Sequence, residues 1–191
     1  MAVAGSIPLP TELDGTQLLV RDAFNIERAA SLFFVSPGQV NFQIPTGTSN
    51  GTAAVTLGIN GTFTAFGDLT VANTAPGLFT ADASGQGYPA AVVYRYRNNA
   101  LIGVEQVVRF DAAQNKMVGV PVDFGAETDT LFLILFGTGI RNRTSQSNVT
   151  ATIGGATAEV AFVGAQGDLV GVDQLNLRIP RSLVTSSGDV N

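Results

Sequence analysis

Short apolar segments separated by turn-forming residues restrict what this chain of 191 residues can fold into. Thr, Val and Phe gather in these segments, and Gly, Asn or Pro interrupts the sequence between them. In residues 40–44 and 92–97 apolar and polar side chains alternate, which is the period of a strand with one buried face. Asn60-Gly61 and Gly154-Gly155 are typical of tight hairpin turns. The pattern predicts an all-β sandwich.

The strands can be placed along the whole sequence. Only residues 24–32 have a spacing that predicts a short helical turn. The predicted strands lie at 17–22, 31–35, 40–44, 52–59, 62–71, 90–97, 102–110, 117–124, 130–137, 149–153, 158–163 and 174–179.

The residue types that the chain lacks exclude several kinds of chemistry. It contains no Cys and no His, so disulfides, structural zinc sites and nucleophiles activated by a neighbouring His are excluded. A net charge of −5 argues against nucleic-acid binding, because phosphate recognition requires clustered Lys and Arg. We therefore expect no enzymatic activity.

No segment has the length and apolar character of a membrane span. The longest uninterrupted apolar run covers residues 131–136, whereas a spanning helix needs about 20 residues. Residues 1–10 lack the basic and apolar regions of a signal peptide. Two alternatives follow, a cytosolic protein and an exported protein whose signal lies outside this sequence.

Two parts of the sequence repeat each other. QVNFQIP at 39–45 and QLNLRIP at 174–180 share four identical residues in seven. LFFV at 32–35 precedes the first segment, and VAFV at 160–163 precedes the second. The repeat indicates a duplication and predicts two domains, residues 1–75 and 76–191, divided at the polar stretch 72–77.

Several blocks of sequence carry a resemblance to a known family. They are LFFVSPGQVNFQIP (32–45), APGLFT (75–80), ETD with LILFGTGI (127–140), VTATIGG (149–155) and GVDQLN (171–176). In this order they are similar to the uncharacterised C-terminal domain family first described from Solibacter, which occurs in secreted bacterial proteins. The resemblance implies two tandem immunoglobulin-like β-sandwich modules, similar to those called IPT/TIG, in an extracellular or cell-surface protein. It implies no catalytic residue.

Each copy of the repeat has an incomplete strand set. Residues 131–139 predict an opening strand for which the first copy has no counterpart. The second copy, in turn, has no counterpart of the strands at 54–59 and 62–71. A sandwich that lacks a strand exposes an edge that can pair with another strand.

Three explanations of the open edges are available. The ends of the sequence need not coincide with the limits of the fold, another subunit can supply a strand, or segment 2–9 folds back onto its own chain. Strand exchange between copies would give rings or filaments. Its expected assembly residues are Ala2, Val3, Ile7, Leu9 and Val190.

The strand at 94–97 is a candidate ligand-binding element. Tyr94, Arg95, Tyr96 and Arg97 alternate, so a strand would place the tyrosines on one face and the arginines on the other. Sugar rings stack on aromatic side chains and accept hydrogen bonds from arginine, which suggests glycan binding. The alternative is an ordinary half-buried strand. Phenylalanines in apolar strands, Phe132 among them, are expected in the core.

The acidic residues fall mainly in predicted turns, which favours turn capping over catalysis. Calcium requires only oxygen ligands, so Glu127, Asp129 and Asp82 are candidate calcium ligands. Neither of their segments has the alternation of an EF-hand loop, and no other cofactor is expected. Gly137-Thr138-Gly139 predicts a tight turn, because a phosphate-binding loop would be followed by a helix.

The functional prediction is a non-enzymatic extracellular structural or assembly module that polymerises by strand complementation. The alternative is a carbohydrate- or surface-binding adhesin module. The expected partners are other copies of the chain, neighbouring domains of a longer secreted protein, or a glycan. Nucleic acid and membrane insertion are not expected.

Overall fold

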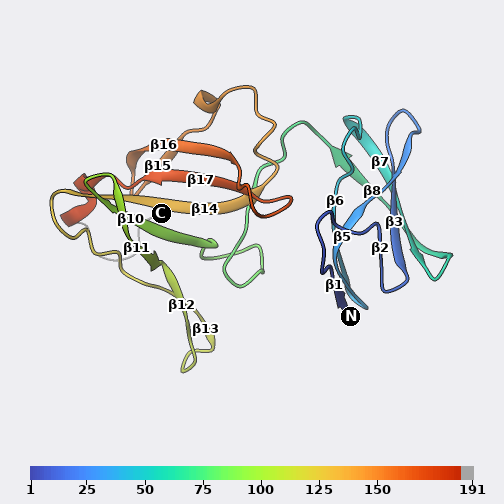
Figure 1. Cartoon of the computed structure of the whole chain (residues 1–191), viewed down its shortest axis with the longest axis horizontal. Helices are drawn as coiled ribbons and strands as arrows, with labels where there is room; N and C mark the ends of the chain where they lie inside the picture. Colours follow the sequence, from blue (N-terminus) through green and yellow to red (C-terminus); the bar gives the residue numbers. More distant parts are fainter. Residues whose placement is uncertain (186–191) are drawn as a thin grey trace. The chain divides into compact units, whose positions relative to one another are not determined.

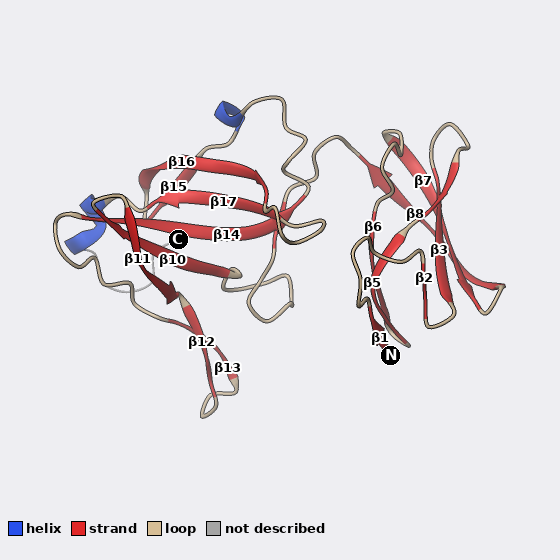
Figure 2. Ribbon diagram, viewed as in Figure 1, coloured by secondary structure: helices blue, strands red, loops and turns tan. Residues whose placement is uncertain are grey.

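The computed structural model describes residues 1–185 and consists of antiparallel strands joined by turns (Figure 2). The helical segments within these residues are the 3-10 turns η1 (Gln146–Asn148) and η2 (Arg181–Thr185). The all-β prediction is confirmed. In the part of the chain that the structure describes, no helix could span a lipid bilayer.

The chain divides into two compact units, Met1–Asn73 and Thr74–Asn191. The division falls inside the polar stretch at 72–77. Each unit has its own strands and its own buried apolar cluster, and the two are described separately below. We call them unit 1 and unit 2.

Unit 1 contains two antiparallel sheets (Figure 1). One sheet has the order β1-β5-β6, formed by Ala2–Val3, Ser31–Ser36 and Gln39–Gln43. The other has the order β2-β3-β7-β8, with β4 also paired to β3. Its strands are Glu12–Leu13, Thr16–Arg21, Gly51–Ile59, Thr62–Val71 and, for β4, Glu27–Ala29. The buried cluster of this unit consists of Leu18, Val20, Ala30, Leu32, Val35 and Ala53.

The helical turn predicted at 24–32 is wrong, because β4 and the start of β5 occupy this segment. The fully buried Asp22 side chain accepts hydrogen bonds from the backbone N–H groups of Phe24 and Ile26 and from Arg28 Nη1, and folds a tight turn before β4. Burial acts to raise the pKa of Asp22, but the hydrogen bonds from Ile26, Arg28, Ser49 and Phe24 together lower it.

Unit 2 is built on one seven-stranded antiparallel sheet of order β11-β10-β14-β17-β16-β15, with β9 paired to β14. A separate hairpin, β12 (Val108–Asp111) and β13 (Lys116–Gly119), extends from it (Figure 1). The sheet strands are β9 Gly77–Leu78, β10 Ala91–Arg97, β11 Ala100–Gln106, β14 Asp129–Thr138, β15 Ala151–Ile153, β16 Ala156–Ala165 and β17 Asp173–Arg178. The buried cluster consists of Ala91, Leu135, Ile140, Ala158, Val163, Leu175 and Leu177.

The repeated sequences fold into equivalent hairpins, β5–β6 in unit 1 and β16–β17 in unit 2. When Gln39 is aligned with Gln174, every cross-strand pair of the first hairpin has its counterpart in the second. Both hairpins also have a register shift at the same place, within 32–34 and within 160–162. The sequence repeat is therefore also a repeat of strand pairing.

A side-chain hydrogen bond is repeated as well. Gln39 Nε2 donates to Asn41 Oδ1 at 2.6 Å, and Gln174 Nε2 donates to Asn176 Oδ1 at 2.7 Å. Residues two apart on a strand share a face, so the bond runs along the same face of each hairpin. This shared geometry allows the two units to be compared position by position.

Candidate binding groove

The sheet of unit 2 has two faces of different character. One set of alternating residues, including Ala91, Leu135 and Leu177, is buried in the core. The other set, which includes Tyr94 and Phe132, is half-buried and lines a groove. The groove therefore belongs to the outer face of the sheet.

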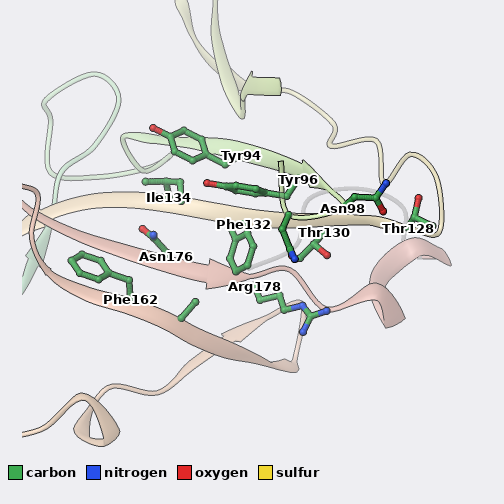
Figure 3. A pocket seen from close by; sticks show the side chains of 12 residues that line it. Tyr94, Tyr96, Asn98, Thr128, Thr130, Phe132, Ile134, Phe162, Asn176 and Arg178 are labelled. Atoms are coloured by element: carbon green, nitrogen blue, oxygen red, sulfur yellow. The ribbon is translucent and has the colours of Figure 1, made fainter. Parts of the chain in front are cut away.

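The groove has a volume of about 730 Å³, within the range of ~300–1,000 Å³ that is usual for ligand sites. Strands β10, β14, β16 and β17 and two loops next to them provide its lining (Figure 3). The lining residues are Tyr94, Tyr96, Asn98, Asn99, Thr128, Thr130, Phe132, Ile134, Ala161, Phe162, Asn176 and Arg178.

Aromatic rings form the apolar part of the groove. Strand register places Tyr94 opposite Phe132, and Tyr96 packs edge-to-face on Phe132 with 5.7 Å between ring centroids. Phe162 lies on the same face, further across the sheet (Figure 3). Ile134 is buried among these strands. A flat apolar ligand surface would meet several rings here.

Polar side chains of β17 lie beside the rings. Asn176 Oδ1 accepts one hydrogen bond, from Gln174, and keeps a second lone pair, so Asn176 can offer a ligand its amide N–H groups and an acceptor. Arg178 is held only loosely, by a 3.4 Å contact with Glu159 in which both side chains are more than half exposed. The guanidinium can therefore turn its donors toward a ligand at low cost.

The structure divides the predicted Tyr94–Arg97 site between the two faces of β10. The tyrosines line the groove, whereas Arg95 and Arg97 both donate to the buried carboxylate of Asp129. Arg95 also pairs with Glu105 at 2.6 Å. The predicted separation of aromatic and cationic faces is present. The arginines do not line the groove, because alternation along β10 places them on the opposite face, where they pair with these carboxylates.

This ion-pair cluster changes how its members titrate. Hydrogen bonds from Arg97 and Arg95 lower the pKa of Asp129 to about 2, against the opposing effect of burial. The hydrogen bonds that Arg95 donates to Glu105 and Asp129 raise the pKa of Arg95, and those that Arg97 donates to Asp129 raise the pKa of Arg97. Asp129 thus holds two cations and stays ionised at any ordinary pH.

The three candidate calcium ligands do not form a common site. Asp129 is committed to the two arginines, and Glu127 is exposed in the loop before β14. Asp82 lies in a separate turn, where it accepts hydrogen bonds from the backbone N–H and the Oγ of Ser84. Within residues 1–185, no group of three acidic side chains is arranged to hold a metal ion.

Four of the five predicted assembly residues lie at the N-terminus of unit 1. Ala2 and Val3 form β1 and pair with β5 of their own chain. Ile7 is exposed and Leu9 is half-buried. In this structure the segment folds back onto its own unit, which is the third of the predicted arrangements. Val190 lies outside the described residues.

Sequence reasoning misses most of the groove. Phe132 is expected in the core, but the alternation along β14 places it on the outer face. Asn176 and Arg178 carry a usable signal, since they alternate with the apolar residues of a predicted strand. Phe162 carries none, because it lies in the apolar run 160–163, where a register shift follows Val160. The pairing of β10, β14, β17 and β16, which brings them together, is not encoded locally.

Comparison of the chain with protein-family models, with curated proteins and with solved structures gave no match. The resemblance to the Solibacter-type family and the immunoglobulin-like assignment of each unit therefore stay predictions.

Proposed function

We propose that this chain is a non-enzymatic, extracellular binding module, and that the groove of unit 2 binds a carbohydrate chain. The observation that carries the proposal is the row of Tyr94, Tyr96, Phe132 and Phe162 on one open sheet face, with amide and guanidinium donors beside it.

The chemistry of the groove suits a sugar. The C–H faces of a pyranose ring pack on aromatic rings, and its hydroxyl groups accept hydrogen bonds from side-chain donors such as Asn176 and Arg178. Asn98, Thr128 and Thr130 add further polar groups at one end of the groove (Figure 3). An extended site with aromatic and polar groups side by side fits a chain of sugar units better than a compact anion.

The composition of the lining supports binding without hydrolysis. Glycosidases place two carboxylates on either side of the scissile bond. The described residues that line the groove include no Asp and no Glu. Asp129, the nearest buried acid along β14, is held ionised by two arginines and is a poor proton donor at neutral pH.

A glycan array followed by calorimetry tests this proposal. We expect saturable binding of an oligosaccharide that weakens at least tenfold in Tyr94→Ala and in Tyr96→Ala. The matched control is Phe110→Ala, which removes an exposed ring outside the groove and should leave affinity unchanged. Absence of binding to any glycan, or equal loss in the control, would contradict the proposal.

Assembly through strand edges is a second candidate function, favoured by a different observation. Strand β8 forms the edge of its sheet, and nearly all of its ten residues are exposed, including Phe63 and Phe66. Strand β6 is the edge of the other sheet of unit 1. Unpaired edges of this kind are the usual sites of strand addition. Light scattering across a hundredfold concentration range would detect self-assembly of the chain.

A further inference from the structure

The open edge of β6 can be interpreted by comparison with unit 2. Strand β6 is equivalent to β17, because the hairpins that contain them share register, bulge and the Gln–Asn hydrogen bond. In unit 2, β17 has a neighbour on each side, β16 and β14. In unit 1, β6 pairs with β5, and no strand among residues 1–185 pairs with its other edge.

In unit 2, the edge of β17 that corresponds to the free edge of β6 is covered by strand β14. It runs antiparallel to β17 and places Leu133 opposite Leu177 and Leu135 opposite Leu175. Leu175 and Leu177 are only 8% and 5% exposed as a result. Beyond the end of β17, the backbone N–H of Ile179 donates to the carbonyl oxygen of Leu131.

The equivalent positions of unit 1 are less protected. Val40 and Phe42 correspond to Leu175 and Leu177 but are half-buried rather than buried. Ile44 corresponds to Ile179 and is 38% exposed. The backbone N–H of Ile179 donates to Leu131, but within residues 1–185 the N–H of Ile44 has no equivalent backbone acceptor. Apolar side chains and a backbone donor at this edge thus lack the cover that their counterparts have.

The edge also lacks the usual protection against strand addition. Natural edge strands are commonly guarded by charged side chains, by proline or by an inward-pointing charge. Residues 39–43 contain two Gln, one Asn, one Val and one Phe, with no charged residue and no proline. Nothing in this strand repels an incoming uncharged strand.

We infer that the free edge of β6 accepts an extended apolar strand of a partner polypeptide, which pairs antiparallel to β6 as β14 pairs with β17. The inference goes beyond both candidate functions: it is independent of the carbohydrate groove, and the added strand comes from a partner rather than from self-assembly of the chain. The incoming strand places alternate apolar side chains over Val40 and Phe42. On the outer face it presents apolar residues opposite Asn41 and Gln39, as Ile134 and Phe136 lie opposite the equivalent residues of β17.

A second copy of β6 fits this pattern less well. In an antiparallel pair of β6 strands centred on Asn41, Val40 would face Phe42 of the other copy, but amides would face amides on the outer face. In unit 2 those outer positions are filled by Ile134 and Phe136. The repeated hairpin therefore favours a strand with the character of β14 over β6 itself.

A peptide probe tests the inference on the full chain. The probe is residues 130–136 of this sequence, TLFLILF, with lysines added at both ends for solubility and a fluorophore for anisotropy. We expect saturable binding with one peptide per chain and at least tenfold weaker binding of a scrambled peptide. Asn41→Lys should reduce affinity at least tenfold, because a charge would then face the apolar outer side of the strand.

The control variant is Thr70→Lys, which adds the same charge to an edge strand of the other sheet, at an exposed position of β8. It should bind the peptide as the parent chain does. Tyr94→Ala, which alters the groove of unit 2, should also bind the peptide as the parent chain does. The peptide result therefore does not depend on whether the groove binds carbohydrate.

Several outcomes would overturn the inference. These are no saturable binding, equal binding of the scrambled peptide, and loss of binding in Thr70→Lys with retention in Asn41→Lys. A dimer of the chain that Asn41→Lys dissociates would also overturn it, because β6 of a second copy would then be the occupant.

Discussion

At the scale of single residues, Asp129 is the acid on which the cationic side of β10 depends. Its pKa of about 2 in the folded chain lies below the ~3.9 of an unfolded Asp, so its contribution to stability is complete above pH ~4. That contribution is lost as the pH falls from about 4 toward 2, because the unfolded chain binds the proton more readily. We expect Asp129→Asn to lower the stability of unit 2 at neutral pH and to flatten its acid dependence.

Tyrosine fluorescence in urea, at pH values from 2 to 7, measures this effect. The three tyrosines of the chain all lie in unit 2, so the signal reports that unit alone. The control is Glu159→Gln, which removes an exposed 3.4 Å contact and should change the free energy of unfolding by under about 1 kcal/mol. If the stability of Asp129→Asn depended on pH as that of the parent chain does, Asp129 would not stabilise unit 2 through its ion pairs with the arginines.

Gly137 gives a second prediction at this scale. A Cβ on Gly137 would clash with the carbonyl oxygen of Gly77, whereas a Cβ on Gly77 would meet nothing within 4 Å. Gly137→Ala should therefore destabilise unit 2 by about 1–3 kcal/mol through overpacking. Gly77→Ala should cost far less. Urea midpoints of the two variants make the comparison, and equal values would refute the close β9–β14 approach.

At the scale of elements, the equivalent strands β17 and β6 should respond differently to truncation. Leu177→Ala removes a buried side chain that β14 covers and should cost about 2–5 kcal/mol. Phe42→Ala removes a larger side chain but only a half-buried one, so we expect a cost of roughly 1–2 kcal/mol. Denaturant unfolding, followed by circular dichroism, measures both. A larger loss in Phe42→Ala would mean that the β6 edge is covered.

The local sequence pattern is sufficient to locate most strands, but it does not show which strands pair with each other. Alternation locates β6, β10 and β17, and the repeated sequence by itself identifies the two equivalent hairpins. The segment at 24–32 does not follow its apolar spacing, because its turn depends on hydrogen bonds to the Asp22 side chain. The local pattern cannot predict the groove, because the groove forms only when strands far apart in the sequence pair with each other.

Residue types alone do not distinguish binding from structural roles. Tyr94 and Tyr96 stand out because their alternation with arginine is unusual. Arg95 and Arg97 are predicted together with the tyrosines, because the sequence does not show that their charges are already paired. The pairing of β10 with β11 and β14 brings them within reach of Glu105 and Asp129. The same register shows that the carboxylate of Asp129, a candidate calcium ligand, is already paired with two arginines.

At the scale of the whole molecule, two units with separate buried clusters should unfold as two cooperative transitions. We expect tyrosine fluorescence to follow one transition and circular dichroism to report both. A fragment of residues 1–73 should fold by itself and reproduce the transition that fluorescence does not detect. A single transition in the whole chain, together with an unfolded fragment, would contradict separate units.

NMR mapping can show whether the outer face of the unit 2 sheet binds carbohydrate. An oligosaccharide selected on the array is titrated into the isotope-labelled chain while amide and aromatic shifts are followed. We predict shift changes concentrated at Tyr94, Tyr96, Phe132, Phe162 and Asn176, with unit 1 unaffected. Changes confined to unit 1 or to loops outside the groove, or no changes at high sugar concentration, would rule out carbohydrate binding in the groove.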